Sequence, residues 1–232
     1  MPLVKIPQAL ELAKVFIYGR GGDVGPQLPR IRRIGSKLGI NPCHVLRTPS
    51  ALNKPGWHLI ARDFKKGMTH AEGAVLSHRG EGVMVPSRDC HVVVAENRKT
   101  GTVVAFHVGR NSVFNRQNCS GGTTEKALGA CDVAYANEEI YAHVLCGICP
   151  DHFEHDDLSY VAPFIEEFGP DVVVDHERGT LDMTAVIIAI CARYGIPKDH
   201  ISTDGLCTYD DDRLGSHRAD KKEQNWIFVR KL

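Results

Sequence analysis

Cys90 and His107 are the pair of residues in this sequence whose types and spacing could do chemistry, and they stand seventeen positions apart. The chain between them is predicted to form a β-hairpin: residues 91–96 (HVVVAE) read as a strand, residues 97–101 (NRKTG) as a turn and residues 102–109 (TVVAFHVG) as a second strand. A hairpin of this length returns the chain beside its start. Cys90, at the head of one strand, could therefore face His107, near the tail of the next.

A cysteine and a histidine that face each other have three interpretations. A thiolate and an imidazole can hold a soft transition metal such as zinc. The imidazole can instead activate the thiol as a nucleophile. In the third interpretation the histidine only forms a hydrogen bond and the cysteine only fills the core, which is the common role of a free cysteine. The residues themselves leave all three open.

Composition narrows the class of protein. The 232 residues are 43% hydrophobic and 24% charged, which is ordinary for a globular chain, and twelve histidines modestly favour metal chemistry. Lys+Arg and Asp+Glu both number 28, so we expect no nucleic-acid partner. No apolar run is long enough to span a bilayer, and the eight scattered cysteines suit a reducing compartment. We therefore expect a cytoplasmic protein without a membrane partner.

The elements that must position the pair are helices and strands intermixed along the whole chain. The strongest helical patterns are residues 28–38, whose apolar positions lie on one face, and residues 181–194, which Thr180 or Asp182 could cap. Residues 158–168 are predicted to form a further amphipathic helix, and weaker helical character marks residues 8–15 and 123–142. Further strands are predicted at residues 73–77, 82–86, 143–148 and 226–230. This mixture predicts one α/β domain.

Three further clusters have ordinary structural interpretations. Cys146 and Cys149 have C-x-x-C spacing, but no second such pair exists, so we interpret them as structural thiols. His152 and His155 lie in an acidic loop and are predicted to be surface residues. Residues 210–212 (DDD) match no calcium loop and are predicted to form a solvated turn.

Seven segments together resemble the YfiH-like laccase-domain family, also called the multicopper polyphenol oxidase or peptidoglycan editing factor family. In chain order these segments are 16–22 (FIYGRGG), 71–77 (AEGAVLS), 88–90 (RDC), 106–109 (FHVG), 181–183 (LDM), 207–208 (CT) and 216–218 (SHR). They follow the family's order of motifs over nearly the whole chain. The resemblance implies a single α/β domain over residues 1–232, with layered mixed sheets flanked by helices.

The resemblance also implies a function. Members of the family are associated with purine nucleoside chemistry, namely phosphorolysis of adenosine, inosine or methylthioadenosine and deamination of adenosine. The expected partners are small molecules, namely a purine nucleoside and phosphate. The protein itself is expected to be a monomer or a homodimer. The older family label is a laccase-type polyphenol oxidase. A thiolate with imidazoles suits zinc, and copper is the less favoured metal. One such set of ligands does not supply the several copper centres that phenol oxidation needs.

The same resemblance assigns roles to particular residues. Cys90 and His107 correspond to two metal ligands, and the third is a histidine of a Q-V-H-G segment. His58 is the nearest candidate for that third ligand and His70 the second candidate, and the ligand could also be absent.

Further roles follow around this pair. Asp89 would orient a ligand or assist proton transfer. Arg20 and Arg110 would take phosphate or ribose oxygens, and Arg218 belongs to the family's S-x-R-R segment at the substrate.

Two alternatives accompany the zinc enzyme. The first is a metal-free hydrolase or deamidase with Cys90 as nucleophile and His107 as base. The second is a non-catalytic binding protein that has kept the fold and lost the site.

Overall fold

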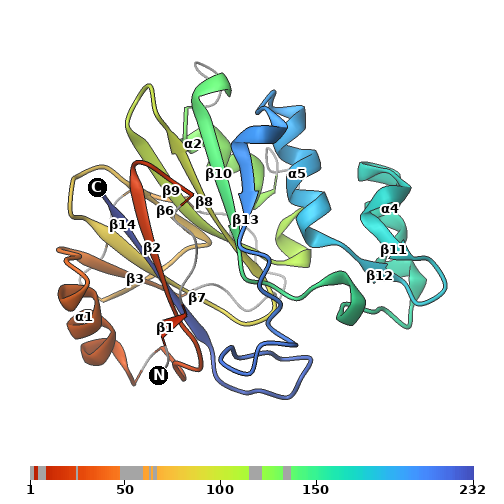
Figure 1. The fold of residues 1–232 in the computed structure, drawn as a ribbon, viewed down its shortest axis with the longest axis horizontal. Helices are drawn as coiled ribbons and strands as arrows, with labels where there is room; N and C mark the ends of the chain where they lie inside the picture. Colours follow the sequence, from red (N-terminus) through yellow and green to blue (C-terminus); the bar gives the residue numbers. More distant parts are fainter. Residues whose placement is uncertain are drawn as a thin grey trace.

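Two six-stranded sheets pack face to face at the centre of the protein (Figure 1). The computed structural model describes residues 3–4, 9–24, 26–47, 60–62, 64, 67–114, 122–132 and 137–232. No helix among these residues has the length and apolar character needed to cross a bilayer.

Each sheet mixes parallel and antiparallel neighbours. The first has the order β1 (Leu3–Val4), β2 (Ala13–Tyr18), β14 (Asn225–Lys231), β7 (Gly82–Ser87), β3 (Cys43–Arg47) and β5 (Met68–His70). The second has the order β13 (Ile201–Thr203), β10 (Ile140–Leu145), β8 (His91–Asn97), β9 (Thr102–Val108), β6 (Gly73–Leu76) and β4 (Ile60–Ala61). A small third sheet pairs β11 (Val173–Asp175) with β12 (Thr180–Leu181).

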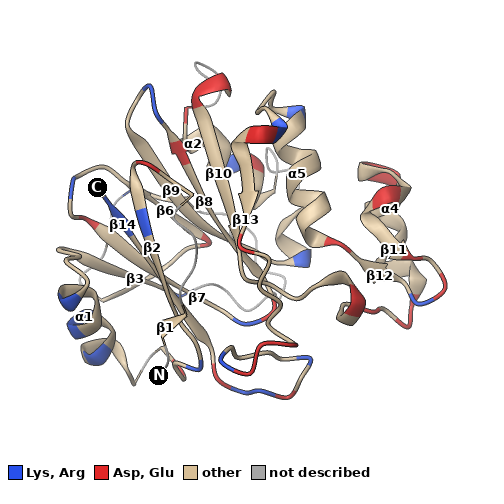
Figure 2. Ribbon diagram, in the orientation of Figure 1, with Lys and Arg blue, Asp and Glu red and all other residues tan. Residues whose placement is uncertain are grey.

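Helices cover the outer face of both sheets, giving four layers. Helix α1 (Leu28–Lys37) packs Ile31 against Met84 and Phe228 of the first sheet. Helices α2 (Thr123–Ala130) and α5 (Met183–Arg193) lie on the second sheet, and α4 (Ala162–Phe168) packs beside α5 at the side of the molecule; all three share one core cluster with the sheet (Figure 1). Figure 2 shows the Lys and Arg residues of α1 along this helix at one side of the molecule. The predicted α/β fold with layered mixed sheets is therefore confirmed.

Strand β8 is buried on both faces, which explains its unbroken apolar run. Val92 and Val94 point into the core between the two sheets, whereas Val93 and Ala95 point into the core beneath the helices. Since each face is covered, the strand needs no alternation of polar and apolar residues.

The elements nearest the chemical pair form as predicted. β8 and β9 make the expected hairpin, with Val92 opposite His107. Helix α5 is also confirmed, and Asp182 caps it by accepting a 3.0 Å hydrogen bond from the Ala185 N–H.

Three local predictions were wrong in part. Residues 9–12 are not helical, because the N–H groups of Glu11 and Leu12 donate to the buried Glu96 carboxylate instead of to a helical turn. In the predicted helical stretch 123–142, α2 ends at residue 130 and β10 begins at residue 140, so the strand predicted at residues 143–148 starts three residues earlier. Tertiary pairing of β10 with β8 overrides the local preference there.

Candidate active site

The hairpin brings Cys90 and His107 together on one face of the second sheet. Cys90 directly precedes β8, and His107 lies in β9 on the neighbouring rung of the ladder, where His91 pairs with Val108. Gly109 lies next to both side chains: a Cβ atom at this position would lie 3.1 Å from the Cys90 sulfur and 3.3 Å from Cε1 of His107. The missing side chain of Gly109 therefore leaves room for the thiol and the ring to meet.

Glu72 holds the other side of the His107 ring. Its carboxylate oxygen lies 2.7 Å from Nδ1, and its backbone carbonyl accepts a 2.7 Å hydrogen bond from the His107 N–H. Glu72 is only 6% exposed. Because an ionised carboxylate only accepts, Nδ1 carries the proton and Nε2 is left for a second partner.

The environment of His107 raises its pKa to about 10. Burial, the largest single influence, lowers this pKa, but the charges and hydrogen bonds of Cys90 and Glu72 together outweigh it. In the absence of a metal the ring is therefore an imidazolium between a sulfur and a carboxylate.

Asp89 fastens two remote loops beside Cys90. One carboxylate oxygen accepts a 2.9 Å hydrogen bond from the Thr208 hydroxyl, and the other accepts 2.9 Å bonds from the backbone N–H groups of His217 and Arg218. The segments 88–90, 207–208 and 216–218, far apart in sequence, thus meet at a single carboxylate. With three donors already bound, Asp89 fits a positioning role.

Two predicted substrate arginines gather around one buried histidine. Arg110 follows Gly109 directly and lies over the Tyr160 ring, 4.8 Å from its centroid. Arg218 donates a 2.8 Å hydrogen bond to the Glu154 carbonyl and lies 5.4 Å from the Phe153 centroid.

His155 is the histidine that these arginines share. Its pKa is lowered, first by burial and then by the positive charges of Arg110 and Arg218. The prediction that His155 is a surface residue was wrong: it is 5% exposed, because its Nδ1 bonds the Gly179 carbonyl and its ring meets Phe153 edge-on. Its Nε2 has no hydrogen-bond partner among the described residues.

Three other predicted residues stand apart from this centre. Arg20 is exposed on a turn, with a left-handed φ of 52°. Among the described residues, no interaction joins Arg20 to Cys90 or His107. His70 is exposed at the end of β5 and completes no three-donor group with the pair. His58 lies in residues 48–59, outside the described residues.

The donors present fit two positions of a metal site. A cysteine sulfur and a histidine Nε2 are zinc-type ligands, and a carboxylate on the opposite ring nitrogen is the usual orienting partner of a metal-bound histidine. Sequence reasoning assigned no role to Glu72, although it stands at the acidic position of the 71–77 segment.

Solved structures share this fold at low sequence identity. A Neisseria meningitidis protein described by the family model DUF152 superposes with a TM-score of 0.74 at 17% identity, covering 99% of this chain and 98% of its own. YlmD from Geobacillus stearothermophilus gives a TM-score of 0.70 at 16% identity, covering 97% of this chain and 94% of its own. YfiH from Bacillus licheniformis gives 0.64 at 14% identity, covering 88% and 80%.

Sequence comparison adds a relative and a family. A Campylobacter jejuni protein named purine nucleoside phosphorylase is 24% identical over 167 residues, which are 68% of this chain. The chain spans about 65% of the length of that curated relative. The family model described as multi-copper polyphenol oxidoreductase laccase matches residues 32–225, and with the YfiH-like fold this match shows that the chain belongs to the laccase-domain family.

Proposed function

We propose that the protein is a purine nucleoside phosphorylase centred on Cys90 and His107. The observation that carries the proposal is the His107 ring, fixed by Glu72 on one side and meeting the Cys90 sulfur on the other. The name of the Campylobacter jejuni relative supports the substrate class.

Arginines beside the pair supply a site for phosphate. Arg110 directly follows Gly109, and both Arg110 and Arg218 act electrostatically on His155. Two guanidinium groups converging on one region suit a phosphate dianion, because their planar donor forks match its oxygens. The half-exposed Tyr160 ring under Arg110 offers a flat face on which a purine could stack.

In the proposed reaction a phosphate oxygen forms a bond to C1′ of the ribose as the bond from C1′ to the purine nitrogen breaks. The purine leaves with the electron pair and takes up a proton, giving a free base and ribose 1-phosphate. Arg110 and Arg218 would hold the phosphate and balance its charge. Asp89 would fix the loop that carries Arg218.

Zinc is the metal that we propose for the pair. Cys90 and His107 would hold it together with His58, and a zinc ion there would supply Lewis-acid polarisation of a substrate oxygen. Glu72 would keep His107 Nε2 turned toward the ion.

The test is product analysis with inosine and adenosine, with and without phosphate. Phosphate-dependent release of hypoxanthine or adenine supports the proposal, and its absence with both nucleosides contradicts it. Conversion of adenosine to inosine without phosphate would identify a deaminase. Metal content of protein purified without added metal, compared with Cys90→Ala, tests the zinc site separately.

The raised pKa of His107 favours a second candidate, a metal-free Cys/His hydrolase. A histidine ring held beside a cysteine sulfur is the arrangement of base and nucleophile that such hydrolases use. This candidate predicts rapid alkylation of Cys90 by iodoacetamide near neutral pH, unaffected by chelators. Slow alkylation that chelators accelerate would reject it in favour of the metal site.

A further inference from the structure

A second group of soft donors lies on two loops outside the Cys90/His107 pair. Cys149 follows the end of β10, and Cys207 and Asp210 lie in the long connection between β13 and β14. One donor atom from each of the three residues lies within 4.8 Å of the other two. We propose that Cys149, Cys207 and Asp210 bind a soft divalent cation of the zinc type. This inference does not rest on the proposed nucleoside chemistry.

The distance between the Cys149 sulfur and the Asp210 carboxylate suits a tetrahedral ion. Zinc–sulfur bonds of about 2.3 Å and zinc–oxygen bonds of about 2.0 Å place two sulfurs roughly 3.8 Å apart and a sulfur and an oxygen roughly 3.5 Å apart. The Cys149 sulfur lies 3.7 Å from Oδ2 of Asp210, close to that spacing. The two sulfurs are 2.9 Å apart and would have to separate by rotation about χ1 to admit the ion.

The backbone holds the two loops against each other before any ion arrives. Gly147 and Cys207 form a parallel β-bridge, and the Thr208 N–H donates a 2.9 Å hydrogen bond to the Gly147 carbonyl. The Cys149 N–H points at the Cys207 sulfur at 3.3 Å. Amide hydrogen bonds to sulfur stabilise a thiolate ligand, so the site is partly prepared for a metal.

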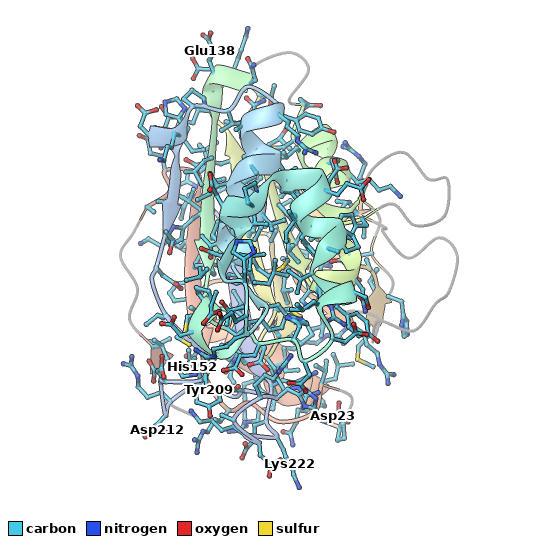
Figure 3. The ribbon with its side chains drawn as sticks, turned by 90° about the vertical axis from the view of Figure 1, so that its right-hand side faces the viewer. Asp23, Glu138, His152, Tyr209, Asp212 and Lys222 are labelled. Carbon is cyan, nitrogen blue, oxygen red and sulfur yellow. The ribbon has the colours of Figure 1, made fainter. Side chains whose placement is uncertain are left out.

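His152 orients the carboxylate ligand. Its Nε2 lies 2.8 Å from Oδ1 of Asp210, which leaves Oδ2 turned toward Cys149. The His152 ring stacks on Tyr209 with centroids 3.9 Å apart, and Figure 3 shows the two side by side at the edge of the molecule, with Asp212 further out. The Asp210 side chain is 60% exposed, so an ion has a path from solvent and room for a water as fourth ligand.

Acidic side chains around the three ligands also favour the binding of a cation. Asp151 lies close enough to act electrostatically on Cys149. Asp211 and Asp212 are paired with the cations Arg213 and Lys221, whereas the side-chain contact of Asp210 with a basic residue, among the described residues, is the hydrogen bond to the His152 ring. A bound divalent ion would take the place of the two thiol protons and offset the combined charge of the three ligands.

The position of the group gives the ion a structural role. Cys207 adjoins Thr208, whose hydroxyl bonds Asp89 next to Cys90. An ion that joins Cys149 to Cys207 would therefore brace the loop that reaches the first site. Because it would bind the folded chain and not the unfolded one, it should raise the thermal unfolding midpoint.

The experiment uses the full chain carrying Cys90→Ala, reduced with a phosphine and freed of metal, and titrated with Co²⁺ and then Zn²⁺. We expect about one equivalent to bind, with the intense thiolate-to-cobalt absorption of a site that contains cysteine, and a higher unfolding midpoint. Cys149→Ser and Cys207→Ser should abolish that absorption. His152→Ala should weaken binding by about 10- to 100-fold, as loss of an orienting partner does.

Asp212→Asn is the matched control for Asp210→Asn. Asp212 is 95% exposed two residues away, so its loss should leave affinity unchanged, whereas the loss of Asp210 should lower it. The proposal is overturned if the reduced Cys90→Ala protein binds no ion at excess metal, or if the cobalt spectrum lacks thiolate bands. It is equally overturned if mass spectrometry finds Cys149 and Cys207 joined as a disulfide that the phosphine does not reduce.

Discussion

Replacing Asp89 separates a positioning role from a proton-transfer role. In Asp89→Asn the amide oxygen can still accept from the N–H groups of His217 and Arg218, and the amide NH₂ can donate to the Thr208 hydroxyl. What is lost is the negative charge. Hydrogen bonds to a charged group contribute about 1.5–3 kcal/mol and neutral ones about 1 kcal/mol, so the two backbone bonds should weaken by about 1–4 kcal/mol in total.

Asp89→Ala removes the acceptors altogether. The Thr208 side chain is fully buried, and its hydroxyl would lose the hydrogen bond that it donates to Asp89, at a cost of about 1–3 kcal/mol. Two backbone bonds disappear as well, and the loop that carries Arg218 is released. We expect the free energy of unfolding to fall by about 2–5 kcal/mol and the KM for phosphate to rise.

The assays are urea unfolding and phosphate-dependent nucleoside cleavage with kcat and KM measured separately. For a positioning residue, Asp89→Asn should keep kcat within about tenfold, while Asp89→Ala loses phosphate affinity. Thr208→Val, which removes one of the three bonds, is the control and should resemble the Asn variant. A drop in kcat of about 100-fold or more in Asp89→Asn, with stability and phosphate KM unchanged, would refute this reasoning and point to proton transfer.

Two further changes test the centre itself. Glu72→Gln in metal-free protein should lower the pKa of His107 from about 10, followed by NMR of the ring protons. Since the folded pKa lies above the ordinary value near 6.5, the stabilisation is complete below about pH 6.5 and disappears as pH rises through 10. The variant should therefore lose about 1.5–3 kcal/mol at pH 6 but little above pH 10 in urea unfolding, and an equal loss at both would contradict the ion pair. Gly109→Ala places a methyl 3.1 Å from the Cys90 sulfur, so that sulfur and the His107 ring must yield by a few tenths of an ångström. We expect a folded protein with less bound metal, and unchanged metal content would show that the pair does not meet at that point.

Local sequence was sufficient to predict the hairpin and the two strongest helices. The run from His91 to Glu96, the turn at residues 97–101 and the second strand carry their own propensities, and β8 and β9 follow them. The ends of helix α5 are likewise predictable from the sequence, because Asp182 caps its start and Gly195 and Pro197 follow its end. The order of short motifs was enough for the family, which the match over residues 32–225 shows.

Only the tertiary structure decided which remote groups meet. Glu72 reaches His107 across 35 residues, and Asp89 reaches the loops at Thr208 and His217 across 119 and 128 residues. The Cys149 thiol lies beside the Cys207 thiol and not beside Cys146, because the chain after β10 meets the loop that carries Cys207 while Cys146 is buried in the core between the sheets. The physical reason is that propensity and spacing act over one turn or one hairpin, whereas the contacts between loops are fixed by how the two sheets and their helices pack.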